Sequence, residues 1–379
     1  MQKNYQQQTL GILGGGQLGR MLIQSAIDYN LEVHILDPDP NAPCKYLSNN
    51  FVNGDLKDFD AVYNFGKNCD VISIEIEHVN TEALLRLEEE GKKVFPQPHI
   101  IALIQDKRSQ KQFYLDQGIP TSPFILTENK EEVKRNAEFL PAVNKLGKEG
   151  YDGRGVQMMR NADDLEKAFD APGLLEKLID FDKELAVIVS RNEAGEVKSF
   201  PSVECAFHPE HNLVEFLFSP ANISPEVDAK ARELAEEVIQ KLDMVGLLAV
   251  EMFLTKDGEL LVNEIAPRPH NSGHHTIEAN YTSQFEQHLR SIMGMPLGDT
   301  ALLCPAAMVN LLGEDGFTGE AIVEGMDEAL KEKGVYLHLY GKKITKPFRK
   351  MGHVTILADE PSQLKEKAER IKELIKIKA

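Results

Sequence analysis

Tryptophan is absent from the 379 residues of the sequence, and cysteine occurs only four times. The cysteines show no CxxC spacing, so the sequence indicates neither a disulfide framework nor a zinc site; they are Cys44, Cys69, Cys205 and Cys304. No eighteen apolar residues run together and residues 1–8 are polar, which gives no support for a membrane span or an export signal. These absences favour the reducing cytoplasm as the location of the protein.

Positive charge is also scarce. The sequence has 42 basic and 60 acidic residues, which gives a formal net charge of −18. Such a surface repels a phosphate backbone, so we expect no general nucleic-acid binding. The hydrophobic content of 42% and the charged content of 27% are those of ordinary globular proteins, and the length exceeds what one hydrophobic core supports. We therefore expect about two to four folded domains.

Two common motifs of nucleotide and metal enzymes are missing. The sequence contains no GxxxxGK[ST] phosphate loop. It therefore does not predict a P-loop NTPase, and no metal-ligand spacing of the HExxH kind is present.

The strongest signal is a predicted hairpin in residues 248–264. Two runs of strand-forming residues flank Asp257-Gly258, a preferred two-residue turn. Such a turn places Glu251 opposite Glu264 on one face of the hairpin, with their Cβ atoms about 5 Å apart. Two like charges at that distance are unfavourable unless a hard cation lies between them, and magnesium in nucleotide sites is held by one or two carboxylates and phosphate oxygens. The pair therefore predicts a magnesium site; the alternative is an exposed hairpin with two unrelated glutamates.

A basic, glycine-rich stretch precedes this hairpin. Residues 145–155 read KLGKEGYDGRG and lie between two predicted strands. Glycines let backbone N–H groups approach an anion closely, while lysine and arginine side chains supply the counter-charge. The pattern favours a loop that covers phosphates, and the alternative is a solvated hairpin turn.

A dense polar loop follows Glu264. Residues 268–274 read RPHNSGH, so an arginine, two histidines, an asparagine and a serine share a short segment with proline and glycine. Such a cluster beside a pair of carboxylates suits anion binding and the stabilisation of charge in a transition state.

The N-terminal region carries a second glycine pattern, Gly14-x-Gly16-x-x-Gly19, between a predicted strand and a predicted helix. Asp37 follows the next strand, so the pattern also fits a nicotinamide dinucleotide site and an oxidoreductase. Further along, Glu75 and Glu77 alternate with isoleucines and would share one face near the end of a third strand, where open α/β sheets bind ligands. A half-exposed edge strand is the alternative for that pair.

Periodicity and turn residues place the other elements. A linker is expected at 96–98, and Ser362 is expected to cap the last helix. The strands are expected at residues 9–13, 31–36, 71–79, 141–145, 155–159 and 247–254, and the helices from about 20, at 106–117, 226–242 and 363–377. Strands alternate with helices first, and a mixed order follows, so the fold class is α/β and α+β.

These motifs together resemble the ATP-grasp superfamily and, within it, the N5-carboxyaminoimidazole ribonucleotide synthetases. The resemblance covers nearly the whole chain and rests on residues 14–20 (GGGQLGR), 75–79 (EIEHV), 106–107 (DK), 150–155 (GYDGRG), 251, 263–264 (NE), 267–274 (PRPHNSGH), 340–342 (YGK) and 349–353 (RKMGH). It implies an ATP-grasp fold with a Rossmann-like N-terminal pre-ATP-grasp domain in residues 1–105. An ATP-grasp domain in 106–295 would have its lid at about 118–182 and its core at about 183–295, and a small C-terminal domain would occupy 296–379.

The resemblance also implies the roles of individual residues. ATP would be bound by Lys107, Lys145, Gly150, Tyr151, Asp152, Gly153, Arg154, Gly155, Val156, Glu176, Lys177, Leu178, Ile179, Glu184, His208, Asn263 and Glu264. The ribonucleotide would be bound by Gln17, Glu75, Tyr151, Asp152, Lys342 and Arg349. Arg268, His270 and Asn271 would take part in catalysis, and Glu251 and Glu264 would hold the metal.

The implied reaction uses ATP, Mg²⁺ (two ions, replaceable by Mn²⁺ in vitro), bicarbonate and 5-aminoimidazole ribonucleotide in purine biosynthesis, in a cytoplasmic homodimer. ATP would phosphorylate bicarbonate, and the carboxyl group would pass to the exocyclic amine of the ribonucleotide. The alternatives are a related ATP-grasp ligase with another acceptor, a non-catalytic nucleotide-binding regulator, and the oxidoreductase that the N-terminal glycines suggest.

Overall fold

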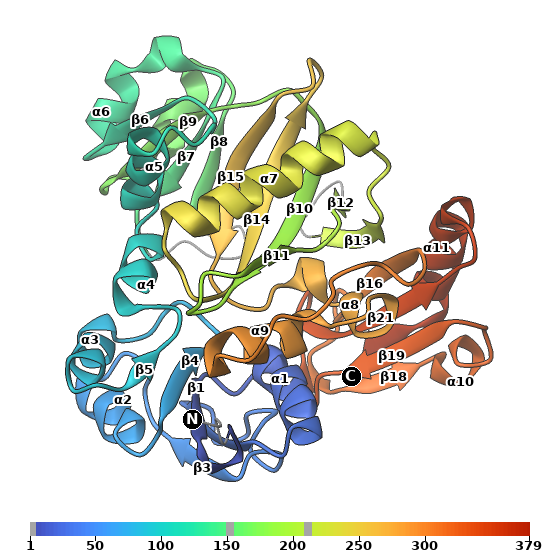
Figure 1. Cartoon of the computed structure of the whole chain (residues 1–379). Helices are drawn as coiled ribbons and strands as arrows, with labels where there is room; N and C mark the ends of the chain where they lie inside the picture. Colours follow the sequence, from blue (N-terminus) through green and yellow to red (C-terminus); the bar gives the residue numbers. More distant parts are fainter. Residues whose placement is uncertain (1–4, 149–154, 208–213) are drawn as a thin grey trace.

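A computed structural model describes residues 5–148, 155–207 and 214–379, and its first part is a five-stranded parallel sheet in the order β3-β2-β1-β4-β5 (Figure 1). The strands are β1 (Thr9–Leu13), β2 (Glu32–Asp37), β3 (Asn50–Asn53), β4 (Val71–Ile74) and β5 (Lys93–Val94). The central strands β1 and β4 are almost entirely buried, as expected for parallel strands covered on both faces.

Helices cover both faces of this sheet. Helices α1 (Gln17–Asp28) and α9 (Gln284–Met293) share a core with Leu10 and Ile12, although α9 lies far away in the sequence. Helices α2 (Phe59–Gly66) and α3 (Thr81–Glu89) pack on the other face.

The third strand is shorter than predicted. β4 ends at Ile74, opposite Leu13, the last residue of the neighbouring strand β1, and the Glu75 N–H donates to the Leu13 carbonyl at 2.9 Å just beyond the paired residues. Glu75 and Glu77 therefore lie in the loop after the strand, and the prediction that they share one face of a strand is wrong.

A second, antiparallel sheet has the order β6-β9-β7-β8. Its elements, with the helices that lead to it, are α4 (Pro98–Ile104), α5 (Lys107–Asp116), β6 (Phe124–Thr127), α6 (Lys130–Arg135), β7 (Ala142–Leu146), β8 (Val156–Met159) and β9 (Gly173–Lys177). Short 3₁₀ turns lie at Tyr5–Gln7, Ala137–Phe139 and Ala162–Lys167. The predicted helix at 106–117 is confirmed, since Asp106 caps α5 by accepting a 3.0 Å hydrogen bond from the Arg108 N–H. Pro98 is the first residue of α4, so the expected linker at 96–98 leads directly into a helix.

The largest sheet in the described part of the chain has the order β15-β14-β10-β12-β13-β16-β21-β19, with β11 beside β10. The strands are β10 (Phe181–Arg191), β11 (Val197–Ser199), β12 (Val203–Phe207), β13 (Val214–Ser219), β14 (Gly246–Thr255), β15 (Leu260–Ala266), β16 (Ala306–Leu312), β19 (Val335–Leu339) and β21 (Lys350–Leu357). Helix α7 (Pro225–Lys241) packs on β10 and β14 through Val238, Val187 and Val250. Strands from the last third of the chain thus extend the central sheet (Figure 1). The division at 105/106 and 295/296 stays a prediction.

The C-terminal part adds helices α8 (Thr276–Ala279), α10 (Met326–Ala329) and α11 (Leu364–Leu374), and two short strand pairs. The pairs are β17 (Gly319–Glu320) with β20 (Ile344–Thr345), and β18 (Ile322–Glu324) with β22 (Lys376–Lys378). The predicted terminal helix therefore ends early, because its last residues pair as a strand. Ser362 is not the N-cap that the sequence predicted; it lies inside a 3₁₀ turn whose capping box joins Glu360 and Gln363.

The predicted hairpin forms, but with a different turn. Leu254 pairs with Leu260, and the loop between the strands holds Lys256, Asp257 and Gly258, with Gly258 at φ 82°. This is the three-residue loop with a left-handed glycine, not the two-residue turn that the sequence predicted. A bulge at Asn263 then shifts the register by one residue, so Glu251 still pairs with Glu264.

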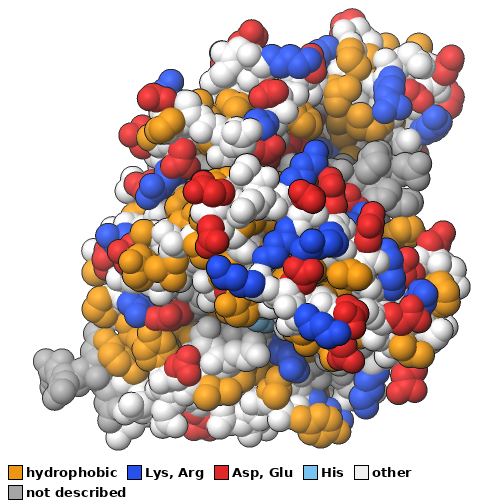
Figure 2. Space-filling view, turned by 90° about the vertical axis from the view of Figure 1, so that its right-hand side faces the viewer, with side chains coloured by type: hydrophobic (Ala, Val, Ile, Leu, Met, Phe, Trp, Pro, Cys, Tyr) orange, Lys and Arg blue, Asp and Glu red, His pale blue; other side chains and the backbone are white. Residues whose placement is uncertain are grey.

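None of the helices in the described residues is long and apolar enough to cross a membrane. Figure 2 shows acidic and basic side chains interspersed over one face of the molecule, with hydrophobic side chains between them.

Candidate active site

Three carboxylates share one face of the central sheet. Glu251 pairs with Glu264 across β14 and β15, and Glu184 lies on the same face because Ala186, two residues further along β10, pairs with Glu251. Burial and the charges of Glu264 and Glu184 raise the pKa of Glu251 to about 8, and burial raises the pKa of Glu184 to about 7. The crowding of acidic groups costs free energy that a hard divalent cation with oxygen ligands removes, so the residues fit magnesium.

The described residues hold no group of three or more His, Cys, Asp and Glu side chains arranged to bind a metal by themselves. A magnesium ion at Glu251 and Glu264 would therefore take further ligands from phosphate oxygens or water, which is its usual behaviour in nucleotide sites.

Lysines surround the second carboxylate of the pair. Lys107, the first residue of α5, places its Nζ 2.9 Å from Glu264 Oε1. Although desolvation raises the pKa of the Glu264 carboxyl, the charges of Lys107 and Lys145 outweigh it and lower that pKa to about 2. Lys145 also reaches the bulge, with its Nζ 3.4 Å from Asn263 Oδ1. The structure thus brings together Lys107, Lys145, Asn263 and Glu264, which the sequence placed around ATP.

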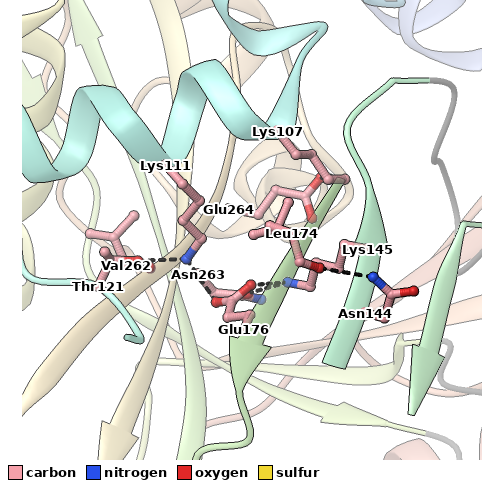
Figure 3. Close-up of polar contacts among 10 residues, drawn as sticks. All are labelled: Lys107, Lys111, Thr121, Asn144, Lys145, Leu174, Glu176, Val262, Asn263 and Glu264. Atoms are coloured by element: carbon pink, nitrogen blue, oxygen red, sulfur yellow. Dashed lines mark hydrogen bonds and ion pairs between the residues drawn. The ribbon is translucent and has the colours of Figure 1, made fainter. Parts of the chain in front are cut away.

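A buried glutamate lies beside these lysines (Figure 3). Glu176 on β9 pairs through Oε2 with Lys145 Nζ at 2.7 Å and through Oε1 with Lys111 Nζ at 2.7 Å. Burial raises the pKa of Glu176, but the charges of Lys145 and Lys111 outweigh it and hold the pKa below its usual value. Burial and the charges of Lys145 and Lys107 lower the pKa of Lys111 to about 8, against the effect of Glu176.

The loop at 267–275 meets the carboxylates from the other side. Arg268 Nε lies 2.8 Å from Glu77 Oε1, and His270 Nε2 lies 3.7 Å from Glu251 Oε1. Burial and the charges of Arg268 and Lys350 lower the pKa of His270 to about 3, so this imidazole is neutral at physiological pH. Asn271 opens the 3₁₀ turn Asn271–Gly273 that follows.

Gln284 fixes the shape of this loop from the buried start of α9. Its Oε1 accepts a 2.9 Å hydrogen bond from the His270 N–H, and its Nε2 donates to the His270 carbonyl at 2.8 Å. The same Nε2 lies 3.0 Å from Nδ1 of the buried His274. A side chain that satisfies both backbone groups of one residue holds that residue in place.

The N-terminal glycine turn binds carboxylates of the protein itself. Gly16 N–H donates to Glu75 Oε1 at 2.7 Å, Gly19 N–H donates to Glu75 Oε2, and Gly15 N–H donates to Asp37 Oδ2 at 2.6 Å. A Cβ at Gly16 would lie 2.2 Å from Glu75 Oε1, so the glycine is required by this close approach. Backbone N–H groups at the start of a helix bind anions. In this turn they already donate to the carboxylates of Glu75 and Asp37, which argues against a dinucleotide phosphate at the same place. Burial raises the pKa of Glu75 to about 7 despite these hydrogen bonds.

Of the two C-terminal basic residues, Arg349 directly precedes β21 and Lys342 lies between β19 and β20. Lys342 Nζ donates to the Lys350 carbonyl at 2.8 Å, and the charge of Lys350 acts on both Glu251 and His270. Arg349 Nη1 donates to the Ile344 carbonyl at 2.6 Å. Lys342 therefore contacts the backbone of Lys350, and the charge of Lys350 acts on the carboxylate site.

The remaining predicted residues are placed as follows. Gln17 begins α1 and Glu184 lies on β10, while Gly155 and Val156 lead into β8. Lys177 N–H donates to the Pro123 carbonyl and Leu178 N–H to the Pro141 carbonyl, so these two amides are used inside the second sheet. Ile179 is the second residue after the end of β9. Gly150, Tyr151, Asp152, Gly153, Arg154 and His208 lie outside the described residues.

Two buried residues of the site were not found by sequence reasoning. Lys111 lies four residues after Lys107 on α5, a spacing that puts both on one helix face and was available as a signal. Gln284 lies eighteen residues beyond Ala266, the last residue of the hairpin, in helix α9, which the sequence analysis did not predict, so no local signal marked it.

Domain families match almost the whole chain. The ATP-grasp domain family matches residues 112–285, the ribonucleotide synthetase preATP-grasp domain matches 7–105, and the phosphoribosylaminoimidazole carboxylase C-terminal domain matches 306–367. These matches confirm the fold class and the resemblance that the motifs indicated.

Individual proteins agree with the domain families. The chain is 39% identical to the N5-carboxyaminoimidazole ribonucleotide synthase of Bacillus subtilis, over 92% of this chain and 91% of that protein. The crystal structure of N5-carboxyaminoimidazole ribonucleotide synthetase from Thermotoga maritima has a TM-score of 0.90 and 42% identity, and covers 98% of this chain and 99% of that one. An Aspergillus clavatus N5-carboxyaminoimidazole synthase, solved with ADP and 5-aminoimidazole ribonucleotide, has a TM-score of 0.89 and 34% identity, with 98% and 99% covered.

Some relatives are longer. The chain is 39% identical to the chloroplastic phosphoribosylaminoimidazole carboxylase of Vigna aconitifolia over 94% of its own length, but spans only 65% of that protein. The near-complete match to the bacterial enzymes and the three matched domains together place the protein: this chain belongs to the N5-carboxyaminoimidazole ribonucleotide synthetase family of ATP-grasp ligases.

Proposed function

We propose that the chain carboxylates 5-aminoimidazole ribonucleotide with bicarbonate and ATP, to give N5-carboxyaminoimidazole ribonucleotide, ADP and phosphate. The observation that carries the proposal is the pairing of Glu251 with Glu264 between Lys107 and the loop that holds Arg268 and His270. This arrangement offers ligands for a cation beside cationic donors for a phosphoryl group. The relative solved with ADP and 5-aminoimidazole ribonucleotide supports the choice of substrate.

The reaction divides into two transfers. A bicarbonate oxygen attacks the γ-phosphorus of ATP, the bond to the β-phosphate oxygen breaks, and ADP leaves carboxyphosphate behind. The exocyclic amine of the ribonucleotide then attacks the carboxyl carbon, phosphate departs with the bridging oxygen, and the amine loses a proton. Holding the reactive intermediate against its acceptor in a closed site protects it from water.

Each cluster of side chains has a place in this scheme. Lys107 and Lys145 would hold the phosphates of ATP, and the segment Glu176 to Ile179 and Glu184 would meet the nucleoside. Arg268 would donate to the transferring phosphoryl group, where charge develops in the transition state. The neutral His270 would present a hydrogen-bonding imidazole that adds no charge to the site. Asn271 would supply a polar side chain beside it.

Magnesium, when bound at Glu251 and Glu264, would neutralise phosphate charge and align the phosphate oxygens. Glu251 and Glu264 would lose their mutual repulsion in the same step, so that metal and nucleotide bind together.

The acceptor would lie between the first sheet and the start of β21. Gln17 would contact it from the start of α1 and Glu75 from the loop after β4, and Lys342 and Arg349 would bind its phosphate. The amides of the glycine turn hold Glu75 in a fixed position, which suits a carboxylate that orients an amine. We further propose a cytoplasmic homodimer, because the four cysteines are free and the resemblance to the family implies that assembly.

ADP formation is expected to require bicarbonate and to be strongly stimulated by 5-aminoimidazole ribonucleotide, because carboxyphosphate without an acceptor only hydrolyses. A coupled ADP assay with each substrate omitted in turn measures this dependence. Equal stimulation when formate replaces bicarbonate would contradict the proposed substrate and favour a related ATP-grasp ligase.

Lys342→Ala and Arg349→Ala are each expected to raise the KM for the ribonucleotide about tenfold or more, because each removes a charge-assisted contact to its phosphate. The KM for ATP should stay near the wild-type value. Lys343→Ala, an exposed neighbour, is the matched control and should change neither constant. A parallel rise in the KM for ATP would place Lys342 or Arg349 at the wrong substrate.

A further inference from the structure

Helix α5 presents two lysines, one helical turn apart, to two different sheets (Figure 3). Lys107 pairs with Glu264 on β15 of the central sheet, and Lys111 pairs with Glu176 on β9 of the second sheet. The helix therefore connects the proposed metal carboxylates to the strand that leads into the nucleoside-binding segment.

Lys111 and Lys145 share the carboxylate of Glu176. The two oxygens of Glu176 are divided, with Oε1 2.7 Å from Lys111 Nζ and Oε2 2.7 Å from Lys145 Nζ. The side chains of Lys111 and Glu176 are each 3% exposed, whereas that of Lys145 is 15% exposed. Lys145 is thus the more exposed of the two lysines that share Glu176.

Contacts with neighbouring side chains fix the position of the Lys111 ammonium group. It donates to Thr121 Oγ1 at 2.6 Å, and that hydroxyl donates in turn to the Val262 carbonyl on β15 at 2.7 Å. The Lys111 Nζ also lies over the ring of the buried Tyr114, 5.7 Å from its centroid. A buried ammonium with these partners has no path to a phosphate, so Lys111 acts on the nucleotide through Glu176.

We propose that Lys111 is a positioning residue that compensates the buried charge of Glu176 and thereby leaves Lys145 available to the nucleotide phosphates. Without Lys111, Lys145 would be the one remaining ion-pair partner of this carboxylate among the described residues. A buried carboxylate holds its last counter-ion strongly, because separating the two leaves an uncompensated charge. Lys145 would then be withdrawn from the phosphates. This inference rests on the proposed role of Lys145 in ATP binding.

The first test is Lys111→Met, which keeps the length of the apolar stem and removes the charge. Its affinity for a magnesium complex of a non-hydrolysable ATP analogue, measured by calorimetry, is expected to fall about ten- to a hundredfold, the worth of one charge-assisted contact. In turnover, the KM for ATP should rise by a similar factor and the KM for the ribonucleotide should not. Gln112→Met on the same helix is the matched control and should bind the analogue like wild type. Wild-type affinity in Lys111→Met would overturn the proposal.

The second test compares Glu176→Gln with Lys111→Met/Glu176→Gln, and it holds even if Lys111→Met alone does not fold. Once the carboxylate is gone, it can no longer draw Lys145 away from the phosphates, so the two variants should bind the analogue equally. Weaker binding by the double variant would show that Lys111 acts independently of Glu176 and would overturn the proposal. Calorimetry with the ATP analogue needs neither bicarbonate nor the ribonucleotide. Its result can therefore be interpreted even if the proposed carboxylation is wrong.

Discussion

Glu264→Gln is expected to abolish activity while leaving the metal-free protein as stable as wild type to within about 1 kcal/mol. Two effects on folding oppose each other. Removing one of two facing carboxylates relieves about 0.2–1 kcal/mol of repulsion, and losing the Lys107 pair to a side chain that is 48% exposed costs about the same. The repulsion is already weakened, because a pKa of about 8 leaves Glu251 protonated at neutral pH.

Wild type and Glu264→Gln should differ in how much ligand binding stabilises them. Wild type is expected to gain about 2.7 kcal/mol when the magnesium–nucleotide complex is present at about a hundred times its Kd, because a ligand that binds only the native state stabilises it by mass action. Glu264→Gln should gain much less. Thermal melts with and without magnesium and a non-hydrolysable ATP analogue measure both values, and Glu259→Gln, exposed on the same hairpin, should behave like wild type. A full ligand-induced shift in Glu264→Gln would exclude this residue as a metal ligand.

Arg268→Met is expected to lower kcat by about 10²- to 10³-fold, the usual cost of removing one donor that faces developing charge. Arg268 is held by Glu77 at 2.8 Å and its side chain is only 20% exposed, so it reaches the site with a fixed orientation. The KM for ATP should change by only a few fold, because the lost contact strengthens in the transition state and contributes little to ground-state binding.

Steady-state kinetics with each substrate varied measure these constants. Arg268→Lys should recover only part of the rate, because a lysine cannot reproduce the forked geometry of the guanidinium. Arg86→Met, on the exposed surface of α3, is the matched control and should retain wild-type kcat. If Arg268→Met instead raised the KM for ATP tenfold with kcat unchanged, Arg268 would be a ground-state binding residue.

The sequence predicted the position of the carboxylate pair, although it predicted the wrong turn. A three-residue loop that ends in left-handed Gly258 displaces the register by one residue, and the bulge at Asn263 restores it. Both features depend on backbone geometry that residue types only weakly determine. The pairing of Glu251 with Glu264 matches the prediction because the displacement by the longer loop and the shift by the bulge cancel.

Contacts between side chains from segments that lie far apart in the chain could not be predicted from the sequence. Glu75 contacts the glycine turn from the loop after β4, which stops at Ile74, opposite the last residue of its neighbour β1. The glycine pattern therefore suggested a dinucleotide site when its amides were already used by Glu75 and Asp37. Lys111 looked like an ordinary charged residue of a helix, and only the packing of β9 against α5 shows that it is buried against Glu176.

The most direct test of the proposed reaction follows one oxygen atom. With bicarbonate labelled with ¹⁸O in all positions, the bridging oxygen of carboxyphosphate comes from bicarbonate and leaves with the phosphorus. Mass spectrometry of the released phosphate in the presence of ATP and 5-aminoimidazole ribonucleotide should therefore find one labelled oxygen per phosphate. Phosphate that carries only unlabelled oxygen would show that bicarbonate is never phosphorylated, and would contradict the proposed reaction.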